Sequence, residues 1–249
     1  MSPLRGARVL VTRAEEDAPA LEDLLVARGG APLRFPCIAF EDAPGLESLV
    51  ARVRAGADLV VLSSPYAARR LFALLGPVDL PFAAAGAATR DAFPGARSCL
   101  IPPGGRTGAQ PLLELLAPLV AGKRVLVPRA EGGNPELVLG LTRAGAQVEA
   151  LTLYRTVTAP RAEPAMLAAL EEGRVDAIAF ASGSAVRGFA SLAGPARAAG
   201  SAVACMGARC AAEARALGIP VDAVGDGGLP ELCDALALAL SNRRLRAPP

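Results

Sequence analysis

The sequence predicts an α/β protein in which one parallel-sheet unit occurs twice. Two observations lead to this prediction. Short apolar segments alternate with segments of helical periodicity along the chain, and several segments of the first half recur in the second half in the same order. Parallel strands that are buried on both faces read as continuous apolar runs, and helices usually connect them. The chain has 249 residues, which is enough for two modest domains with separate cores.

The first elements are a strand, a helix and an extended segment. "RVLVTR" (8–13) is the strand. In "EEDAPALEDLLVARGG" (15–30), leucines recur at helical spacing, acidic residues stand in the first turn and two glycines end the helix. "APLRFPCIAF" (31–40) follows as an extended stretch.

The same rhythm continues to the end of the chain. We expect strands at 57–64, 81–86, 124–129, 175–182, 202–207 and 220–228. We expect helices at 65–76, from about 87, at 109–122 and at 229–240, with a Pro/Gly loop at 102–108 and a frayed tail at 241–249.

A repeat underlies this rhythm. "RVLVTRAEE" (8–16) returns as "RVLVPRAEG" (124–132), and "DLVVLSSPYAARRLF" (58–72) matches "DAIAFASGSAVRGFA" (176–190). Two further pairs follow in the same order, 84–89 with 205–210 and 108–116 with 227–235. All strand–helix units look somewhat alike, but the nine-residue match and the paired serines at strand ends favour a duplicated unit.

Composition excludes several classes of protein and site. The chain is 52% hydrophobic and 20% charged, with a net charge of +2, which argues against disorder and against a broad nucleic-acid-binding surface. It has no histidine, so histidine triads, bases and metal ligands are excluded, and we expect no metal site. No apolar run reaches the ~20 residues of a membrane helix. The odd cysteine count, without a CxxC pair or a signal peptide, predicts reduced thiols in the cytoplasm. The cysteines are Cys37, Cys99, Cys205, Cys210 and Cys233.

The ends of the expected strands carry small hydroxyls, glycines and two arginines. In open parallel sheets, ligands bind beyond the carboxyl ends of the strands, where helix N-termini and glycine backbones favour anions. Two facing domains of this kind would form a cleft for a polyanion. The candidate binding residues are Thr12, Arg13, Ser63, Ser64, Gly86, Thr89, Arg129, Ser182, Gly183, Ser184, Gly207 and Cys210.

Plainer interpretations of these residues stay open. A serine at a strand–helix junction is often only an N-cap, and both arginines could face solvent. "PPGGRTG" (102–108) lacks the Gly-Lys-Ser/Thr of a P-loop, and "GDGGLP" (225–230) lacks G-x-G-x-x-G. Neither loop therefore predicts nucleotide binding.

Several of these segments together resemble the uroporphyrinogen-III synthase family over essentially the whole chain. The resemblance rests on "VLVTRAEEDAPALEDLLVARGG", "DLVVLSSPYAARRLF", "RVLVPRAEGGNPELVLGLTRAGAQVEALTLYRT", "DAIAFASGSAVRGF" and "MGARCAAEARALGIPV". It implies two similar flavodoxin-like parallel-sheet domains joined by two extended linker strands. Domain 1 would be discontinuous, at 1–36 plus 160–249. Domain 2 would be 42–152, and the linkers 37–41 and 153–159.

The resemblance also implies an activity. Enzymes of the family dehydrate and cyclise hydroxymethylbilane, a linear tetrapyrrole with eight carboxylates, and invert its ring D. The reaction uses no metal or organic cofactor. By the same analogy we expect a cytoplasmic monomer that takes part in porphyrin and haem biosynthesis and contacts hydroxymethylbilane synthase at most transiently.

Site residues carry over one by one. Tyr154 matches the family's tyrosine and is the expected proton donor to the departing hydroxyl. Thr89 matches a family threonine, whereas Cys210 stands where the second copy usually has threonine. Backbone N–H groups at the strand ends would hold the acetate and propionate groups, with Arg13 and Arg129 as charge partners.

Two other classes of function remain as alternatives. A cytoplasmic two-lobed small-molecule binding protein would share the duplicated layout, although such proteins are usually exported. A compact glycosyltransferase would also have two lobes, but the chain is short and shows no nucleotide-sugar signature. Turnover of hydroxymethylbilane distinguishes the synthase from both.

Overall fold

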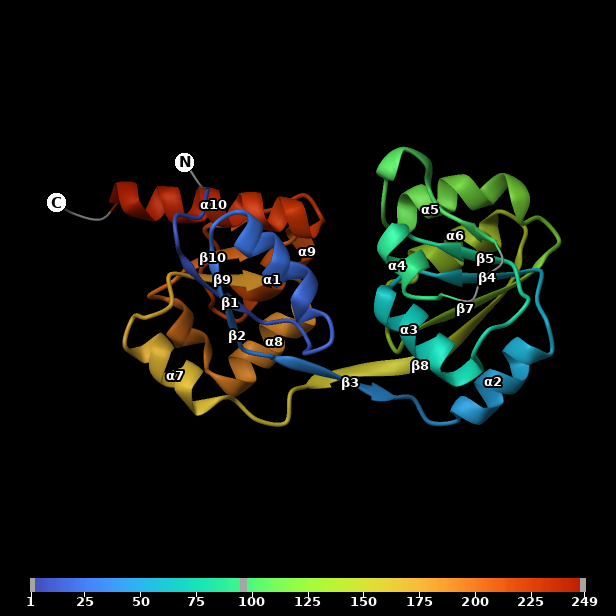
Figure 1. Cartoon of the computed structure of the whole chain (residues 1–249), viewed down its shortest axis with the longest axis horizontal. Helices are drawn as coiled ribbons and strands as arrows, with labels where there is room; N and C mark the ends of the chain where they lie inside the picture. Colours follow the sequence, from blue (N-terminus) through green and yellow to red (C-terminus); the bar gives the residue numbers. More distant parts are fainter. Residues whose placement is uncertain (1–2, 95–97, 247–249) are drawn as a thin grey trace. The chain divides into compact units, whose positions relative to one another are not determined.

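A computed structural model of the chain describes residues 3–94 and 98–246. They divide into two compact units, Met1–Phe40 with Thr156–Pro249, and Glu41–Arg155. Each unit contains a sheet of mainly parallel strands with helices packed against it, so the fold is mixed α/β (Figure 1). No helix within these described residues is long and apolar enough to cross a membrane.

The sheet of the first unit has the strand order β11-β10-β9-β1-β2, and all its pairings are parallel. Its strands are β1 (Arg8–Val11), β2 (Ala31–Arg34), β9 (Ala177–Phe180), β10 (Ala202–Cys205) and β11 (Ala223–Val224). Strands β1, β9 and β10 lie in the middle, and except for the partly exposed Arg8 their residues are buried. This burial on both faces explains their uninterrupted apolar sequences.

Alternate residues of these strands face two helical layers. Val9 and Val11 pack with α1 (Ala18–Ala27) and α10 (Leu229–Arg246). Leu10 belongs to the opposite core. That core also includes residues of α7 (Pro164–Glu171), α8 (Gly183–Leu192) and α9 (Ala208–Ala216), and a short 3-10 helix spans Pro195–Ala198. The first unit is therefore a three-layer structure.

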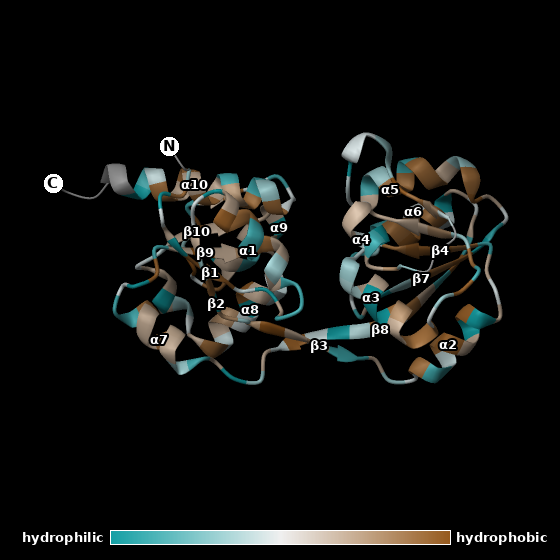
Figure 2. Cartoon of the chain, viewed as in Figure 1, coloured by the Kyte–Doolittle hydropathy of each residue, from teal (hydrophilic) through white to brown (hydrophobic). Residues whose placement is uncertain are grey.

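The other sheet, of order β3-β8-β7-β4-β5-β6, belongs mainly to the second unit, although residues 38–40 of β3 and 156–158 of β8 are counted with the first. Its strands are β3 (Ile38–Asp42), β4 (Leu59–Leu62), β5 (Phe82–Ala84), β6 (Cys99–Leu100), β7 (Arg124–Ala130) and β8 (Gln147–Thr158). Its helices are α2 (Leu46–Arg54), α3 (Pro65–Leu75), α4 (Ala87–Asp91), α5 (Ala109–Leu116) and α6 (Glu136–Arg143), with 3-10 turns at Pro103–Gly105 and Ala117–Leu119. The central strands β4 and β7 are strongly hydrophobic (Figure 2).

The same arginine–aspartate hydrogen bonds join neighbouring strands at the start of a central strand in both units. The backbone N–H of Arg8 donates to Asp176 Oδ2 at 2.7 Å, and the backbone N–H of Arg124 donates to Asp58 Oδ2 at 2.8 Å. In each pair the aspartate N–H donates back to the arginine carbonyl. The two "RVLV" segments therefore pair in the same way with the strands that follow Asp176 and Asp58.

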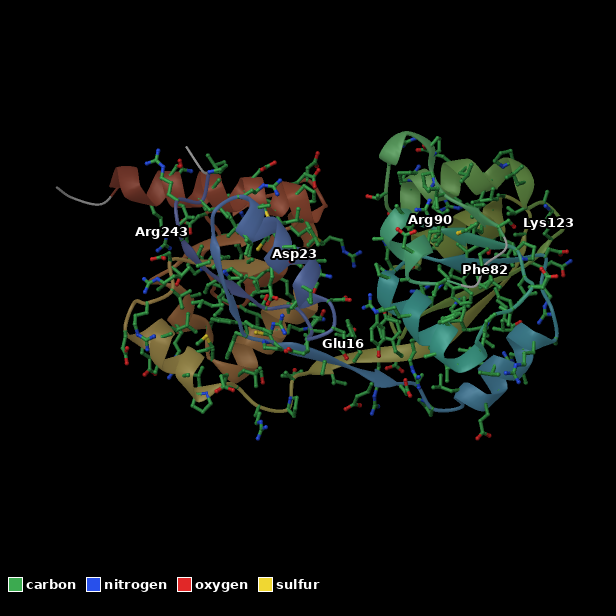
Figure 3. The ribbon with its side chains drawn as sticks, viewed as in Figure 1. Glu16, Asp23, Phe82, Arg90, Lys123 and Arg243 are labelled. Carbon is green, nitrogen blue, oxygen red and sulfur yellow. The ribbon has the colours of Figure 1, made fainter. Side chains whose placement is uncertain are left out.

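Several expected elements have different lengths in the structure, and the helix expected at 109–122, for example, ends at Leu116. The strand expected at 220–228 is confined to Ala223–Val224. The frayed tail was wrong for residues 241–246, because α10 continues to Arg246, and residues 247–249 lie outside the described part. Arg243, labelled on α10 in Figure 3, donates to Asp222 Oδ2 and to the carbonyl of Ala199, which anchors this last part of the helix.

Candidate functional site

A cavity of about 210 Å³ lies at the carboxyl ends of β4 and β7 in the second unit. The residues around it come from the strand ends, from the loop after β7, from β8 and from helices α5 and α6. Its polar lining consists of Ser63, Ser64, Arg129, Gly133, Asn134 and Tyr154. Four of these six are residues that the sequence predicts for binding or catalysis. Sites for whole drug-sized ligands are usually ~300–1,000 Å³, so this cavity fits one part of a large substrate.

Tyr154 owes its position to an irregularity in the sheet. In the β7–β8 pairing, Arg129 lies opposite Thr152 whereas Ala130 lies opposite Tyr154, so Leu153 is an extra residue on β8. Such a bulge bends a strand and redirects its side chains, and bulges are frequent beside active sites. The Tyr154 side chain is almost completely buried, and its ring contacts Tyr66 edge-on with a centroid separation of 4.6 Å.

Ser64 connects the tyrosine to a helix. It is the N-cap of α3, and its Oγ accepts the backbone N–H of Ala67 at 3.1 Å. The same Oγ lies 3.4 Å from the Tyr154 hydroxyl. Ser64 therefore does what the plainer interpretation expected of it, capping a helix, and in addition contacts the expected catalytic residue.

The two arginines expected to bind anions differ in their surroundings. The Arg129 guanidinium is half-buried beside Gly133, and within the described part of the chain it forms no ion pair or hydrogen bond. Arg13 instead forms an ion pair with Asp17 and donates from Nε to the Asp17 carbonyl. Arg129 has its donors available for a ligand carboxylate, whereas Arg13 would have to rearrange.

The first unit has a counterpart cavity, also of about 210 Å³. Arg13, Asp17, Ser182 and Ser184 supply most of its polar lining. Ser182 caps α8 by accepting the N–H of Ala185 at 3.2 Å, and its Oγ lies 3.0 Å from Ser184 Oγ. No tyrosine is among the described residues that line this cavity, and its aromatic lining residue is Phe40.

The remaining candidates lie outside both cavities. Thr12 is fully buried and its hydroxyl donates to the Ala179 carbonyl at 2.7 Å, so its side chain stabilises the sheet. Thr89 is 4% exposed and Cys210 is 6% exposed. Gly183 is the first residue of α8, and Gly86 and Gly207 are N-caps of α4 and α9.

The cysteine at position 210 forms part of a thiol pair. Its Sγ donates to the Phe180 carbonyl at 3.5 Å, and it is hydrogen-bonded to Cys205. This contact lowers the pKa of the Cys210 thiol and raises the pKa of the Cys205 thiol, which burial raises further. All five cysteines are free thiols.

Sequence reasoning missed several residues of the two cavities. Tyr66, which lies outside the cavity lining but contacts the Tyr154 ring, was also not singled out, although it stands two residues after the expected Ser64. Gly133 and Asn134 follow the expected strand in "EGGNP", a turn-forming stretch that could have indicated them. Asp17 lies four residues after Arg13, which is the helical spacing of an ion pair.

Groups of three or more side chains that could hold a metal ion were not found within residues 3–94 and 98–246. The chemistry that the second-unit cavity offers is that of a phenol, two hydroxyls, a guanidinium and backbone amides.

Comparisons with known proteins agree with one another. A family model described as uroporphyrinogen-III synthase HemD matches residues 4–227. A uroporphyrinogen-III synthase from Synechococcus elongatus is 28% identical over 203 residues, which is 76% of this chain and 76% of that protein.

Two solved structures have a similar fold. Uroporphyrinogen-III synthetase from Helicobacter pylori has a TM-score of 0.61 at 18% identity, covering 94% of this chain and 99% of that chain. A mutant uroporphyrinogen III synthase from Thermus thermophilus has a TM-score of 0.52 at 22% identity, covering 95% and 100% respectively.

Proposed function

The chain belongs to the uroporphyrinogen-III synthase family, and on this premise we propose how its residues perform the family's reaction. The enzyme is a cyclising lyase that converts hydroxymethylbilane to uroporphyrinogen III in tetrapyrrole biosynthesis. It expels the terminal hydroxyl as water, inverts ring D and closes the macrocycle. The binding-protein alternative is not favoured, because a family model of an enzyme matches nearly the whole chain.

The chemistry sets two tasks for the protein. The pyrrole nitrogen expels the hydroxyl and leaves an electrophilic azafulvene, and a proton donated to the departing oxygen accelerates this step by ~10²–10⁴. Without assistance the chain closes into the uninverted isomer. The enzyme must therefore hold ring D so that its substituted carbon is attacked through a spiro intermediate, and such positioning can contribute ~7–11 kcal/mol.

Tyr154 is the proposed proton donor. A phenol with a reference pKa of ~10 carries its proton at neutral pH. The single observation that supports this role best is the position of Tyr154, in a cavity that a serine hydroxyl and the Arg129 guanidinium also line. A structural linker tyrosine would not need to line a cavity together with groups suited to carboxylates.

Arg129 and the strand-end amides are the proposed carboxylate ligands. The fork of the Arg129 guanidinium matches a propionate or acetate, and in the other unit the N-termini of α8 and α9 provide amides near Ser182, Gly183, Ser184 and Gly207. Ser63, Gly86 and Thr89 would act in the same way in the second unit. Because many contacts share the work, single substitutions should reduce activity tens-fold.

We propose further that the two units are flavodoxin-like repeats, domain 1 being 1–36 plus 160–249 and domain 2 being 42–152, with linkers at 37–41 and 153–159. The strand order supports this. Numbered along the chain, the first sheet reads 2-1-3-4-5, the flavodoxin-like order. The order β8-β7-β4-β5-β6 is the same if β7 is counted as the first strand, so the second repeat is a circular permutation of the first.

We also propose where the enzyme works, which protein it meets and its oligomeric state. Five free thiols fit a reducing compartment, which supports a cytoplasmic location. Hydroxymethylbilane closes spontaneously into the wrong isomer, so a brief encounter with hydroxymethylbilane synthase would protect it in transfer. We expect the enzyme itself to be a monomer.

One experiment tests the function directly. Enzymatically made hydroxymethylbilane is supplied, the products are oxidised and the porphyrin isomers are separated. The type III isomer should dominate, and type I alone would eliminate the proposed activity. In the same assay Tyr154→Phe should lower kcat by about 100-fold or more, and a turnover near that of the wild type would remove Tyr154 from its role.

A further inference from the structure

The hydroxyl of Ser64 is bonded on both sides. It accepts the N–H of Ala67 at 3.1 Å and lies 3.4 Å from the Tyr154 hydroxyl. A serine hydroxyl has one proton and two acceptor sites. With one acceptor site occupied by the amide, Ser64 can still donate its proton to Tyr154 or accept the proton of Tyr154.

We propose that Ser64 is a positioning residue for Tyr154, which stabilises the phenolate left when Tyr154 gives up its proton. The inference rests on the proposed role of Tyr154. The Oη–H bond of Tyr154 breaks, its proton joins the departing hydroxyl to form water, and the electron pair stays on the phenol oxygen. Ser64 then donates its O–H to that oxygen, and no bond of Ser64 breaks. The proton released when the pyrrole system regains aromaticity restores the phenol.

Three features of the site support this role. The Ala67 amide polarises the Ser64 hydroxyl and makes it a better donor, because linked hydrogen bonds strengthen one another. A separation of 3.4 Å is long for two hydroxyls, and catalytic hydrogen bonds often shorten only when the substrate is bound. The edge-on contact with Tyr66 limits how far the Tyr154 ring can turn away from Ser64.

The cap and the tyrosine contact can be separated by substitution. Glycine is nearly as good an N-cap as serine, so Ser64→Gly removes the hydroxyl and largely retains the helix. Ser64→Thr keeps both the hydroxyl and the cap. The duplicated chain provides a matched control in Ser182, which caps α8 in the same way but has Ser184 as its hydroxyl neighbour.

Steady-state kinetics with hydroxymethylbilane provide the test. We expect Ser64→Gly to lower kcat about tenfold with KM little changed, as for a lost hydrogen bond to a charged group, and Ser64→Thr to restore most of kcat. In a Tyr154→Phe background, Ser64→Gly should change kcat by less than about twofold. Any effect of Ser182→Gly should instead multiply with that of Tyr154→Phe, since Ser182 belongs to the other unit.

The possible failures are distinguishable. Suppose that Tyr154→Phe is impaired but that Ser64→Gly keeps the wild-type kcat, or lowers kcat equally with and without Tyr154. Ser64 is then only a helix cap, and the inference is overturned while the proton-donor role of Tyr154 stands. If Tyr154→Phe itself turns over normally, the inference fails together with the proton-donor role. Thermal unfolding of the Ser64→Gly and Ser182→Gly proteins checks that both remain folded.

Discussion

Gly188 shows how a single missing side chain allows two segments of the first unit to meet. It lies inside α8 and is buried. A Cβ added at this position would lie 2.0 Å from the carbonyl oxygen of Cys37 and 2.8 Å from its carbonyl carbon. Backbone atoms cannot move aside as a side-chain end can, and this same carbonyl accepts the N–H of Ala159.

Gly188→Ala should therefore destabilise the protein, although alanine favours helices more than glycine by ~1 kcal/mol. We expect a loss of about 3 kcal/mol or more in the free energy of unfolding, typical of overpacking against rigid backbone. Gly200→Ala is the control, because its Cβ would meet nothing within 4 Å. Urea unfolding of the two variants checks this, and a stable Gly188→Ala protein would show that α8 can shift.

The buried Cys37 thiol should make the free energy of unfolding fall as the pH becomes alkaline. Burial raises the pKa of this thiol, so the native state keeps its proton at pH values where the unfolded chain has lost it. Its contribution to stability is fully present below the ordinary thiol pKa of ~9 and is lost as the pH rises further, at about 1.4 kcal/mol per pH unit.

Unfolding free energies measured between about pH 7 and pH 10.5 test this dependence. Cys37→Ala should be less stable at neutral pH, because a buried sulfur is removed, but its stability should fall less steeply above about pH 9. Other buried thiols also contribute, since burial raises the pKa of Cys233 as well. Equal slopes for the wild type and Cys37→Ala would show that Cys37 ionises normally in the native state.

For single residues, the sequence indicated which side chains stand at strand ends but not which of them line a cavity. Ser64, Arg129 and Tyr154 line one cavity, whereas Thr12 is turned into the sheet. The difference depends on the β7–β8 bulge and on strand register, which arise from pairing between distant segments. A pattern within one segment cannot reveal them.

Among the elements, the aspartates at the starts of β4 and β9 connect neighbouring strands. Asp176 accepts the backbone N–H of Arg8 and pairs with its guanidinium through two oxygens. Asp58 accepts the backbone N–H of Arg124 only, within the contacts of the described residues, because that guanidinium pairs with Glu149. Both aspartates hold the first residue of a central strand in register.

Asp176→Ala should therefore cost about 1–2 kcal/mol, the range for charge-assisted hydrogen bonds at a partly exposed position. The control is Glu172→Ala, which removes only an exposed pair with Arg174 and should change stability by less than about 0.5 kcal/mol. Denaturant titration of both variants gives the comparison, and similar small losses would mean that strand register does not depend on Asp176.

The central strands could be predicted from the sequence more completely than the helices. The central strands are continuous apolar runs, and the sequence analysis placed them correctly. Helices α2, α6, α7, α8 and α9 were not among the helices that the sequence analysis named. Helix α7, "PAMLAALE", is apolar on nearly all sides and lacks a polar face that would mark its period. The last turns of α10 depend on Arg243 reaching Asp222, a tertiary contact that local sequence does not indicate.

For the whole molecule, the important feature is that each core is built within one unit. Leu25 of α1 packs with residues of β1, β9 and α10, all from the first unit. Leu116 of α5 packs with residues of β4, β7 and α6, all from the second. Both side chains are fully buried, so truncation to alanine should cost about 2–5 kcal/mol at either site.

We therefore expect Leu25→Ala and Leu116→Ala to destabilise different parts of the chain. Hydrogen exchange read by mass spectrometry should show faster exchange in peptides from 1–40 and 156–249 for Leu25→Ala, and in peptides from 41–155 for Leu116→Ala, because a lost core contact raises the local opening equilibrium of the unit that contains it. Faster exchange throughout the chain in both variants would mean that the units unfold as one cooperative block. In that case the repeat would describe how the sequence arose and the topology of each sheet, but not the thermodynamic units of the folded protein.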